Sequence, residues 1–289
     1  MTGHPPGGTG SRAVVTAGCR PPVRGCQCVS VPEMIEVELY RQAAEHALGR
    51  RITGIRAPDE WYLKGRTTPQ LLRSALRGRT FTGTRRIGKL LLLDTEGPTL
   101  GLRFGMTGRL VVDGQAPIER LAYSSARDNP AWVRFAVGLD GIGELRLVDA
   151  RRLGGVELDP DEAHLGRDAL QVGQAELRDL LARSRAPLKA WLLDQSHVAG
   201  VGNLLVDETL WRAGLDPARP ASSLDATEVR RLHRHLRRTI GELTTRGGSH
   251  TGDLHEARVR GATCPRDGTP LQRRTIGGRT TYSCPRHQH

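Results

Sequence analysis

The spacing of apolar residues changes from strand-like to helix-like near residues 160–175, and this change divides the 289-residue chain. Before it, a leading helix expected at Glu33–Leu48 is followed by short apolar runs that predict strands. These runs are Lys89–Asp94, Thr99–Phe104, Leu110–Asp113, Trp132–Leu139 and Glu144–Asp149. After it, apolar residues recur every three or four positions and predict helices at Ala175–Ala182, Pro187–Asp194, Leu204–Ala213 and Asp225–Thr245. Strands followed by helices indicate an α+β multidomain chain.

The two ends of the chain differ from its middle. Residues 1–31 hold six glycines, four prolines and no acidic residue, so they cannot bury enough apolar surface to offset the entropy of ordering. We expect this segment to be disordered or to be no part of the mature protein. The end of the chain is short, glycine-rich and bracketed by Cys264 and Cys284. The predicted organisation is a sheet domain at 32–160, a helical domain at 161–255 and a small unit at 256–289.

The charge of the chain indicates a polyanionic partner. Lys and Arg number 43 against 31 Asp and Glu, which gives a net charge of +12 and a pI near 10.4. Nucleic acid is the simplest such partner, and a merely soluble basic surface is the alternative. No stretch approaches the roughly 18 apolar residues of a membrane span, and no secretory signal precedes the folded part. Five cysteines, an odd number, argue against a disulfide framework and favour the cytoplasm, or the nucleoid in a bacterium.

Six short motifs carry residues suited to chemistry, and each is weak by itself. In chain order they are Pro32-Glu33-Met34-Ile35-Glu36-Val37-Glu38, Arg85-Arg86-Ile87-Gly88-Lys89, Gly105-Met106-Thr107-Gly108, Asp149-Ala150-Arg151-Arg152-Leu153-Gly154, Gly200-Val201-Gly202-Asn203 and Cys264-x2-Asp267-x16-Cys284-x2-His287. Their order and spacing over residues 32–288 resemble the formamidopyrimidine-DNA glycosylase and endonuclease VIII family of base-excision repair enzymes. The resemblance implies an N-terminal catalytic β-sandwich with a leading helix, a helix–two-turn–helix DNA-binding domain and a C-terminal zinc-finger-like β-hairpin.

The same resemblance implies a DNA glycosylase that is also a DNA-(apurinic or apyrimidinic site) lyase, acting as a monomer on damaged double-stranded DNA. The family's nucleophile is the α-amine of an N-terminal proline, which falls on Pro32. An α-amine with a pKa of about 7.7–8 is partly neutral at pH 7, so it can attack C1′ and form a Schiff base. β- and then δ-elimination follow. Glu33 is expected to shuttle protons, Glu36 to lie beside the damaged base, and Lys89 to complete the catalytic set.

This chemistry requires that Pro32 begin the chain. In the sequence as given, Val31 precedes it, so the Pro32 nitrogen is a tertiary amide with no basicity. We expect Val31 to mark the true start, as a valine-type initiation codon translated as Met and removed ahead of proline. The 289-residue form is then expected to be inactive.

The resemblance also implies a set of DNA contacts. Phosphate contacts are expected from Lys89, Lys189, Asn203 and Arg279, and Arg103 can also meet a phosphate, with the Gly200 and Gly202 amides adding hydrogen bonds. Met106, Arg151 and Leu153 match the wedge that fills the space left by the flipped nucleotide. The basic run from Arg230 to Arg238 is instead expected to be a solvated helix face.

Three departures bear on the substrate. Leu153 stands where many members have Phe, and Ala150 replaces their Pro, so the wedge stacks less well and leaves the opposite base open. Arg103 replaces the usual His but can still meet a phosphate. The segment 247–261 is shorter than the capping loop of enzymes specific for 8-oxoguanine. Its length favours oxidised pyrimidines, ring-opened purines or abasic sites.

The expected zinc site is atypical. The family commonly uses four cysteines, whereas here the set is Cys264, Asp267, Cys284 and His287, with His289 able to replace Asp267. All of these residue types bind zinc. A zinc-free hairpin that keeps the finger's shape is the alternative.

A catalytically silent DNA- or RNA-binding protein of the same fold is the competing function. Helix–two-turn–helix elements also serve pure binding proteins, and a blocked Pro32 would leave binding intact. The set Pro32, Glu33, Glu36 and Lys89 favours the enzyme, because a pure binder does not need it.

Overall fold

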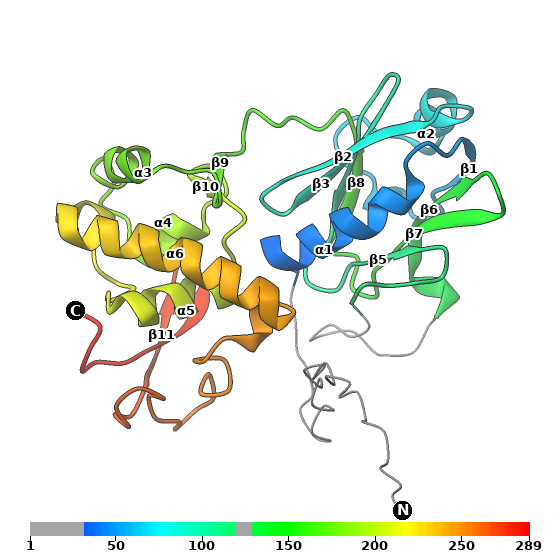
Figure 1. The fold of residues 1–289 in the computed structure, drawn as a ribbon. Helices are drawn as coiled ribbons and strands as arrows, with labels where there is room; N and C mark the ends of the chain where they lie inside the picture. Colours follow the sequence, from blue (N-terminus) through cyan, green and yellow to red (C-terminus); the bar gives the residue numbers. More distant parts are fainter. Residues whose placement is uncertain (1–31, 119–128) are drawn as a thin grey trace, which may run out of the picture.

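The computed structural model describes residues 32–118 and 129–289, and the predicted disordered segment 1–31 lies outside these ranges. Figure 1 shows a β-rich body and a helical body side by side. They are joined by α1 (Met34–Ala44) and by the chain that runs from β8 (Gly155–Leu158) to β9 (Arg167–Asp168). The site described below lies where these two bodies meet.

Two four-stranded antiparallel sheets form the first body. One sheet has the order β1-β6-β7-β5 and is built from β1 (Ile52–Arg56), β6 (Val133–Leu139), β7 (Gly143–Val148) and β5 (Arg109–Val112). The other has the order β2-β3-β4-β8 and is built from β2 (Phe81–Ile87), β3 (Leu90–Thr95), β4 (Leu100–Arg103) and β8. The short helix α2 (Pro69–Leu76) begins at Thr68, whose hydroxyl accepts a hydrogen bond from the Leu71 N–H. This body is the expected β-sandwich.

Helix α1 contributes side chains to two separate cores. Val37, Tyr40 and Ala44 are fully buried in the sandwich core, and the rings of Tyr40 and Phe104 pack with centroids 4.4 Å apart. Met34 and Ile35, at the start of the helix, belong instead to the core of the helical body. Since a large buried apolar side chain contributes about 1.5–3 kcal/mol, α1 fixes the two bodies against each other.

Four helices make the second body: α3 (Gln174–Leu181), α4 (Leu188–Leu193), α5 (Asn203–Ala213) and α6 (Ala226–Arg246). The long helix α6 begins at Asp225, whose carboxylate accepts hydrogen bonds from the Thr227 and Glu228 N–H groups. It ends at Gly247, which has a φ of +98°. A two-residue parallel pair, β9 with β10 (Val198–Ala199), precedes α5.

The chain ends in an antiparallel hairpin of β11 (Gln272–Ile276) and β12 (Arg279–Ser283). Behind it Trp211, Leu254, Cys264 and Cys284 form a small buried cluster. Short 3-10 helices complete the described part at Glu45–Ala47, Glu60–Tyr62, Pro130–Trp132, Ala221–Ser223 and Ser249–Thr251. None of the helices in the described ranges is long and apolar enough to cross a membrane.

The fold class is confirmed, and most predicted elements are found within a few residues of their expected bounds. Glu33–Leu48 is divided into α1 and a 3-10 turn, because the helix loses its regular pattern at Glu45. The expected strand at Lys89 begins instead at Leu90, since Gly88, with a φ of +57°, and Lys89 form the turn between β2 and β3. β1, β2, α2 and β8 were not predicted; β2 and β8 carry charged residues among few apolar ones.

Candidate functional site

Glu33 lies where the sandwich meets the helical body, and its side chain is only 2% exposed. Its carboxylate accepts hydrogen bonds from the backbone N–H groups of Gly202 (3.1 Å), Leu204 (2.8 Å) and Leu205 (3.1 Å). The first N–H groups of a helix lack partners within that helix and carry partial positive charge, so they hold an anion well. Glu33 thus joins the start of α1 to the start of α5.

Glycines allow this close approach of backbones. A Cβ added at Gly202 would lie 2.2 Å from the Glu33 Cδ, which no side chain could tolerate. A Cβ at Gly88 would lie 2.7 Å from the Ala199 Cβ and 2.7 Å from the Gly200 nitrogen. The turn that carries Lys89 can therefore pack directly on the segment before α5.

Glu36 faces the same boundary one helical turn after Glu33. It is buried, and it accepts hydrogen bonds from the Glu33 N–H at 2.9 Å and from both the N–H and the hydroxyl of Ser249, each at 2.7 Å. Ser249 follows α6, so Glu36 ties α1 to the end of that helix. The three donors fix the orientation of the carboxylate.

Burial changes the proton affinities of the charged groups here. Burial raises the pKa of Glu33, which nearby Lys89 lowers and Glu36 raises. Burial lowers the pKa of Lys89. The positive charge of Arg279 lowers it further, whereas the negative charge of Glu33 raises it. Pro32 is buried directly beside Glu33. The carboxyls of Glu33 and Glu36 and the ammonium of Lys89 thus influence one another's charge next to Pro32, and the Arg279 guanidinium acts on Lys89.

Arg86 of β2 and Asp168 of β9 form an ion pair between the two bodies, close in sequence to Lys89. Their charged groups are 2.5 Å apart and nearly excluded from solvent. Asp168 also accepts a hydrogen bond from the Gly88 N–H at 2.8 Å. The turn at Lys89 is consequently held from the helical body, which sets the position of the lysine.

A second group of predicted residues lies on a loop that Asp149 organises. The Asp149 side chain is fully buried and accepts hydrogen bonds from the N–H groups of Arg151 (3.1 Å), Leu153 (2.9 Å) and Gly154 (2.9 Å). The hydroxyls of Tyr62 and Thr107 also donate to it. The buried carboxylate binds three N–H groups of the loop and is itself held by two hydroxyls. Arg151 and Leu153 are therefore exposed to solvent on a rigid loop.

The turn containing Met106 packs against this loop. Gly105 has a φ of +56°, and a Cβ on it would lie 2.5 Å from the carbonyl carbon of Leu153. Met106 is half-buried, whereas Leu153 is 47% exposed. The structure therefore brings Met106 and Leu153 onto neighbouring turns, as a two-sided wedge would require.

Lys189 does not reach the surface. It is fully buried and pairs with Asp207 at 2.7 Å, and it donates to the Thr281 hydroxyl at 2.8 Å and the Thr280 carbonyl at 3.1 Å. The Lys189 ammonium is thus used inside the protein, and the expected phosphate contact stays a prediction that requires this ion pair to open. Lys189 also holds the strand that begins at Arg279, which is exposed.

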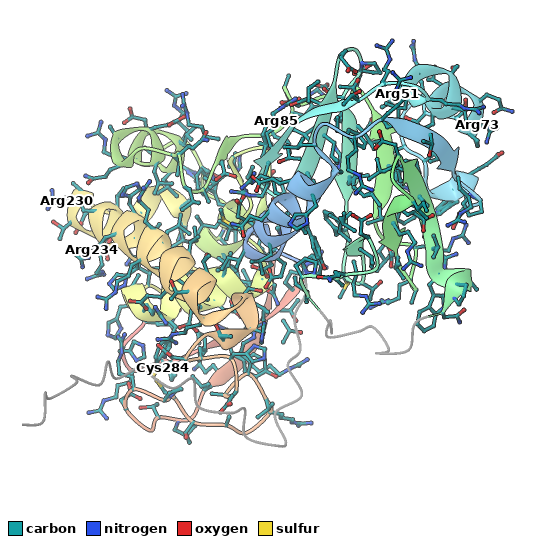
Figure 2. The ribbon with its side chains drawn as sticks, turned by 45° about the vertical axis from the view of Figure 1, so that its right-hand side comes forward. Arg51, Arg73, Arg85, Arg230, Arg234 and Cys284 are labelled. Carbon is teal, nitrogen blue, oxygen red and sulfur yellow. The ribbon has the colours of Figure 1, made fainter. Side chains whose placement is uncertain are left out.

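The other predicted phosphate ligands lie on different elements of the two bodies. Arg103 forms an ion pair with Glu157 at 2.7 Å on the sandwich. Asn203 begins α5, next to Gly200 and Gly202, and its Oδ1 is buried with no hydrogen-bond partner among the described residues. Figure 2 shows the arginines of the basic run, including Arg230 and Arg234, along the outer face of α6.

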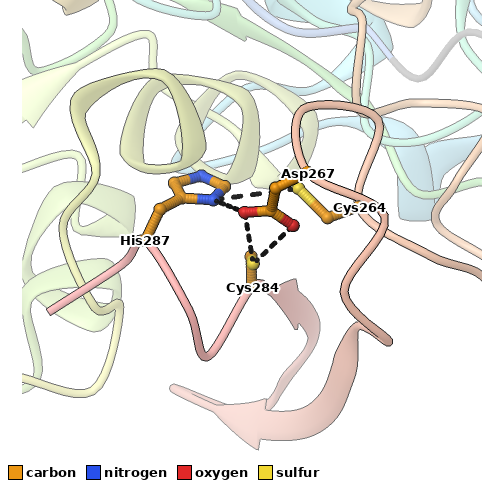
Figure 3. Close-up of side chains that lie close together, drawn as sticks. All are labelled: Cys264, Asp267, Cys284 and His287. Carbon is orange, nitrogen blue, oxygen red and sulfur yellow. Dashed lines mark hydrogen bonds and ion pairs between the residues drawn. The ribbon is translucent and has the colours of Figure 1, made fainter.

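Cys264, Asp267, Cys284 and His287 converge at the base of the hairpin (Figure 3). Their possible ligand atoms all lie within 4.8 Å of one another. The His287 Nδ1 is 2.9 Å from the Asp267 Oδ2 and 3.8 Å from the Cys264 Sγ, and Asp267 approaches the Cys284 Sγ to 3.4 Å. Tetrahedral zinc separates N, O and S ligands by about 3.3–3.8 Å, so the set fits one such ion.

Contacts around the cluster favour the same interpretation. The His287 Nε2 lies 3.2 Å from the Trp211 carbonyl, an arrangement that directs the Nδ1 lone pair at the cluster. The Trp211 indole donates to the Cys264 sulfur at 3.3 Å. The neighbouring His287 and Thr269 donors lower the pKa of Asp267, the backbone N–H of Thr269 most, which keeps that carboxylate ionised. His289, the alternative ligand, lies outside this cluster of described residues.

Two models of known protein families match most of the chain. Residues 31–156 match the model of the formamidopyrimidine-DNA glycosylase N-terminal domain, and residues 165–253 match that of the H2TH domain. The chain belongs to the formamidopyrimidine-DNA glycosylase family. Members of this family are base-excision repair DNA glycosylases with abasic-site lyase activity.

Relatives and solved structures of the formamidopyrimidine-DNA glycosylase family cover nearly the whole described chain. The chain is 34% identical to that of Salinispora arenicola, over 89% of this chain and 96% of the relative, and 34% identical to that of Geobacillus kaustophilus, over 89% and 100%. Lactococcus lactis Fpg in complex with DNA containing Fapy-dG superposes with a TM-score of 0.75 at 25% identity, covering 89% of this chain and 100% of that one. Its complex with DNA containing an abasic site superposes with a TM-score of 0.75 at 25% identity, and covers 89% of this chain and 99% of that one.

Apart from the metal-binding set at the hairpin, the formamidopyrimidine-DNA glycosylase motifs lie in two places in this structure. Pro32, Glu33, Glu36, Lys89 and Arg279 gather at the boundary between the bodies, although 190 residues separate Lys89 from Arg279. Met106, Arg151 and Leu153 stand on the turns that Asp149 supports.

Three residues that position these groups were missed by sequence reasoning. Asp168 and Ser249 belong to no motif, since each acts through contacts with residues far away in the sequence. Asp149 was included only as the first residue of its motif. An aspartate that directly follows an apolar strand and precedes a short loop ending in glycine is the sequence signal that could have indicated the role of Asp149.

Proposed function

We propose that residues 32–289 form a DNA glycosylase with abasic-site lyase activity, in which the α-amine of Pro32 is the nucleophile. The observation that carries this proposal is the Glu33 carboxylate, buried beside Pro32 and bound by three N–H groups of the facing body. An acid that costs so much to bury is seldom retained for packing alone. Its neighbours Lys89 and Glu36 complete the set.

The Pro32 amine suits attack on a sugar carbon. An α-amine has a pKa of about 7.7–8, and the cations Lys89 and Arg279 favour its neutral form. The nitrogen lone pair forms a bond to C1′, and the bond from C1′ to the damaged base breaks with its electron pair going to the base. The nitrogen then loses its proton, and its lone pair breaks the C1′–O4′ bond to leave a cationic C1′=N group. This group accepts electrons when a proton leaves C2′ and the C3′–O3′ bond breaks, and again when a proton leaves C4′ and the C5′–O5′ bond breaks.

Glu33 is the proposed proton carrier. The ring oxygen O4′ needs a proton as it leaves C1′, and a base must afterwards remove a proton from C2′. Burial raises the pKa of the Glu33 carboxyl, which leaves more of it protonated to donate to O4′ and, once ionised, makes it a stronger base for the C2′ proton. Glu36, held by three donors, is proposed to lie beside the damaged base.

The proposal requires removal of residues 1–31, since Val31 acylates the Pro32 nitrogen in the full sequence. The family model begins at residue 31, and the relatives match 89% of the chain, which supports a functional unit that starts at Pro32. We assign residues 32–160 to catalysis, 161–255 to DNA binding and 256–289 to the zinc-finger-like hairpin.

Damaged double-stranded DNA is the proposed partner. Asn203 and Arg279 would hold phosphates across the boundary, with Arg103 released from Glu157 to join them. The N–H groups of Gly200 and Gly202 are already used by Gln195 and Glu33, so they are not proposed to bind phosphate. Met106, Arg151 and Leu153 would fill the space left by the flipped nucleotide. We propose that the protein is a monomer in the cytoplasm or nucleoid.

We assign zinc to Cys264, Asp267, Cys284 and His287. When bound, the ion would cross-link the two ends of the hairpin and take no part in bond breaking. These four residues would thereby hold the strand from which Arg279 projects.

Strand cleavage tests this function. Protein that begins at Pro32 is expected to incise a duplex with a preformed abasic site and to leave phosphates at both ends of the gap, as β,δ-elimination requires. Binding without incision would instead favour the catalytically silent nucleic-acid-binding protein.

A further inference from the structure

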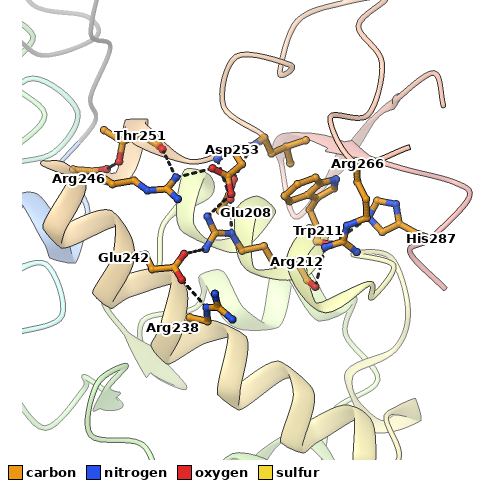
Figure 4. A network of polar contacts seen from close by, with 12 residues as sticks. Glu208, Trp211, Arg212, Arg238, Glu242, Arg246, Thr251, Asp253, Arg266 and His287 are labelled. Carbon is orange, nitrogen blue, oxygen red and sulfur yellow. Dashed lines mark hydrogen bonds and ion pairs between the residues drawn. The ribbon is translucent and has the colours of Figure 1, made fainter. Parts of the chain in front are cut away.

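The loop that follows α6 is firmly built although it contains little regular structure. Figure 4 shows Arg212 at the centre of its supports, in ion pairs with Glu208 at 2.6 Å, Glu242 at 2.5 Å and Asp253 at 2.7 Å. Glu208 also accepts hydrogen bonds from the Asp253 and Leu254 N–H groups at 3.1 and 2.9 Å. At its other end the loop is held by Ser249 on Glu36. Residues 249–254 are consequently fixed at both ends.

His250 lies within this fixed segment, and His255 follows directly after it. The rings of His250 and His255 meet edge to face with centroids 6.4 Å apart. The Nδ1 of each is buried and has no hydrogen-bond partner within residues 32–118 and 129–289. Buried polar atoms are nearly always bonded, so an imidazole left without a partner on a rigid loop calls for a ligand.

His250 shares its surroundings with Glu36. Gly248 has a φ of +145°, and a Cβ built on it would lie 2.8 Å from the His250 Nδ1 and 3.0 Å from the Glu36 Oε1. Both atoms therefore border the same bare glycine, and a side chain there would fill the space between them. Burial lowers the pKa of His250, and Glu36 opposes this, so the ring is neutral at pH 7 and offers one donor and one acceptor.

We propose that His250 binds the polar edge of the flipped damaged base and thereby sets which lesions this chain excises, with His255 fixing its ring. This inference rests on the proposed function. It adds a specificity-determining residue that lies outside the six sequence motifs.

The chemistry of the site favours a neutral base over a phosphate. The Glu36 carboxylate faces the same space and would repel an anion. A neutral imidazole with both a donor and an acceptor complements the N–H and C=O groups of an oxidised base. A site built for such hydrogen bonds discriminates strongly, because a base without matching groups leaves the imidazole nitrogen unpaired again.

Excision and abasic-site incision separate this role from a structural one. Protein starting at Pro32 would be compared with His250→Ala and His250→Asn under single-turnover conditions. The duplexes carry dihydrouracil, 5-hydroxyuracil or 8-oxoguanine, and a fourth carries a preformed abasic site. His250→Ala is expected to slow removal of the best lesion about 10- to 100-fold, since a hydrogen bond is lost in a buried site. Incision of the abasic duplex, which has no base to recognise, is expected to stay within about twofold.

His250→Asn places an amide near the position of Nδ1 and is expected to recover most of the lost excision. His164→Ala is the matched control, because that side chain is 86% exposed. Equal losses on lesion and abasic duplexes, or unchanged excision of every lesion by His250→Ala, would overturn the inference. Absence of abasic incision by the unmutated protein would instead contradict the proposed function, and this inference with it.

Discussion

Ser249 binds the Glu36 carboxylate twice, through its N–H and its hydroxyl, both at 2.7 Å. The two residues are 213 positions apart, and their contact closes the end of α6 onto the start of α1. Both side chains are almost fully buried. The helical body is therefore joined to the start of α1 at Glu36 as well as at Glu33.

Ser249→Ala tests the contribution of this contact to stability. The variant keeps the N–H bond and loses the hydroxyl bond to a buried carboxylate, so the free energy of unfolding should fall by about 1–3 kcal/mol. Urea unfolding measures this change. Ser196→Ala is the control, because its hydroxyl binds Asp194 on the exposed surface and its loss should change stability by less than about 0.5 kcal/mol. Equal effects of the two substitutions would show that the Ser249 contact adds nothing.

Glu33→Gln tests the proton-carrier role. The amide keeps the shape of the side chain but carries no exchangeable acid proton, so abasic incision should slow about 10²–10⁴-fold at pH 7. Gel analysis of single-turnover reactions measures this loss. Incision at the normal rate by Glu33→Gln would remove Glu33 from the mechanism.

The same pair of proteins tests the proton affinity of Glu33. Burial raises its pKa in the folded state, so the folded state binds more protons than the unfolded state at pH values above the ordinary 4.5. Stability contributed by this group must then fall as the pH rises from 4.5 through the raised pKa. The unfolding free energy of the unmutated protein, relative to Glu33→Gln, should decrease over that range. A relative increase would contradict the raised pKa.

Leu153 tests the wedge. Its side chain is 47% exposed on a loop that Asp149 holds, so substitution should leave folding unchanged. Leu153→Ala should bind an abasic duplex about 5- to 30-fold more weakly, since about 1–2 kcal/mol of apolar contact is lost. Leu153→Phe should bind it at least about threefold more tightly through stacking. Fluorescence anisotropy measures both affinities.

Ile142→Phe is the matched control for the wedge, because Ile142 is fully exposed at the turn between β6 and β7. If it changed the affinity as much as Leu153→Phe does, the effect would come from added apolar surface in general.

Metal removal tests the cysteine–aspartate–histidine cluster. We expect one zinc per chain by elemental mass spectrometry, and a lower melting temperature after chelation. Asp267→Ala should reduce the zinc content, whereas His289→Ala should not, since His289 lies outside the cluster. Full zinc in Asp267→Ala with loss in His289→Ala would reverse the ligand assignment.

Local patterns in the sequence predicted the order of the strands and helices. The α+β order and the helices α3 to α6 follow from spacing within short segments, whereas the four members of the metal cluster follow from the resemblance to the family's zinc finger. β2 and β8 were missed because each strand is stabilised by its neighbours in the sheet, which local alternation does not record.

The site was predicted in its members but not in its supports. Glu33 and Lys89 lie in motifs, whereas Ser249 and Asp168 matter through contacts with residues far away in the sequence. Lys189 was assigned from the resemblance, and only the fold shows that Asp207 holds its ammonium inside the protein.

Borohydride trapping tests the central claim most directly. Protein beginning at Pro32, the 289-residue form and a Pro32→Gly variant of the shorter form would each be mixed with an abasic duplex and borohydride. The Pro32 form is expected to give a covalent protein–DNA adduct whose mass spectrum places the DNA on Pro32. The 289-residue form should give none, and the glycine variant far less adduct than proline. No adduct from the Pro32 form, or an equal one from the 289-residue form, would contradict the account.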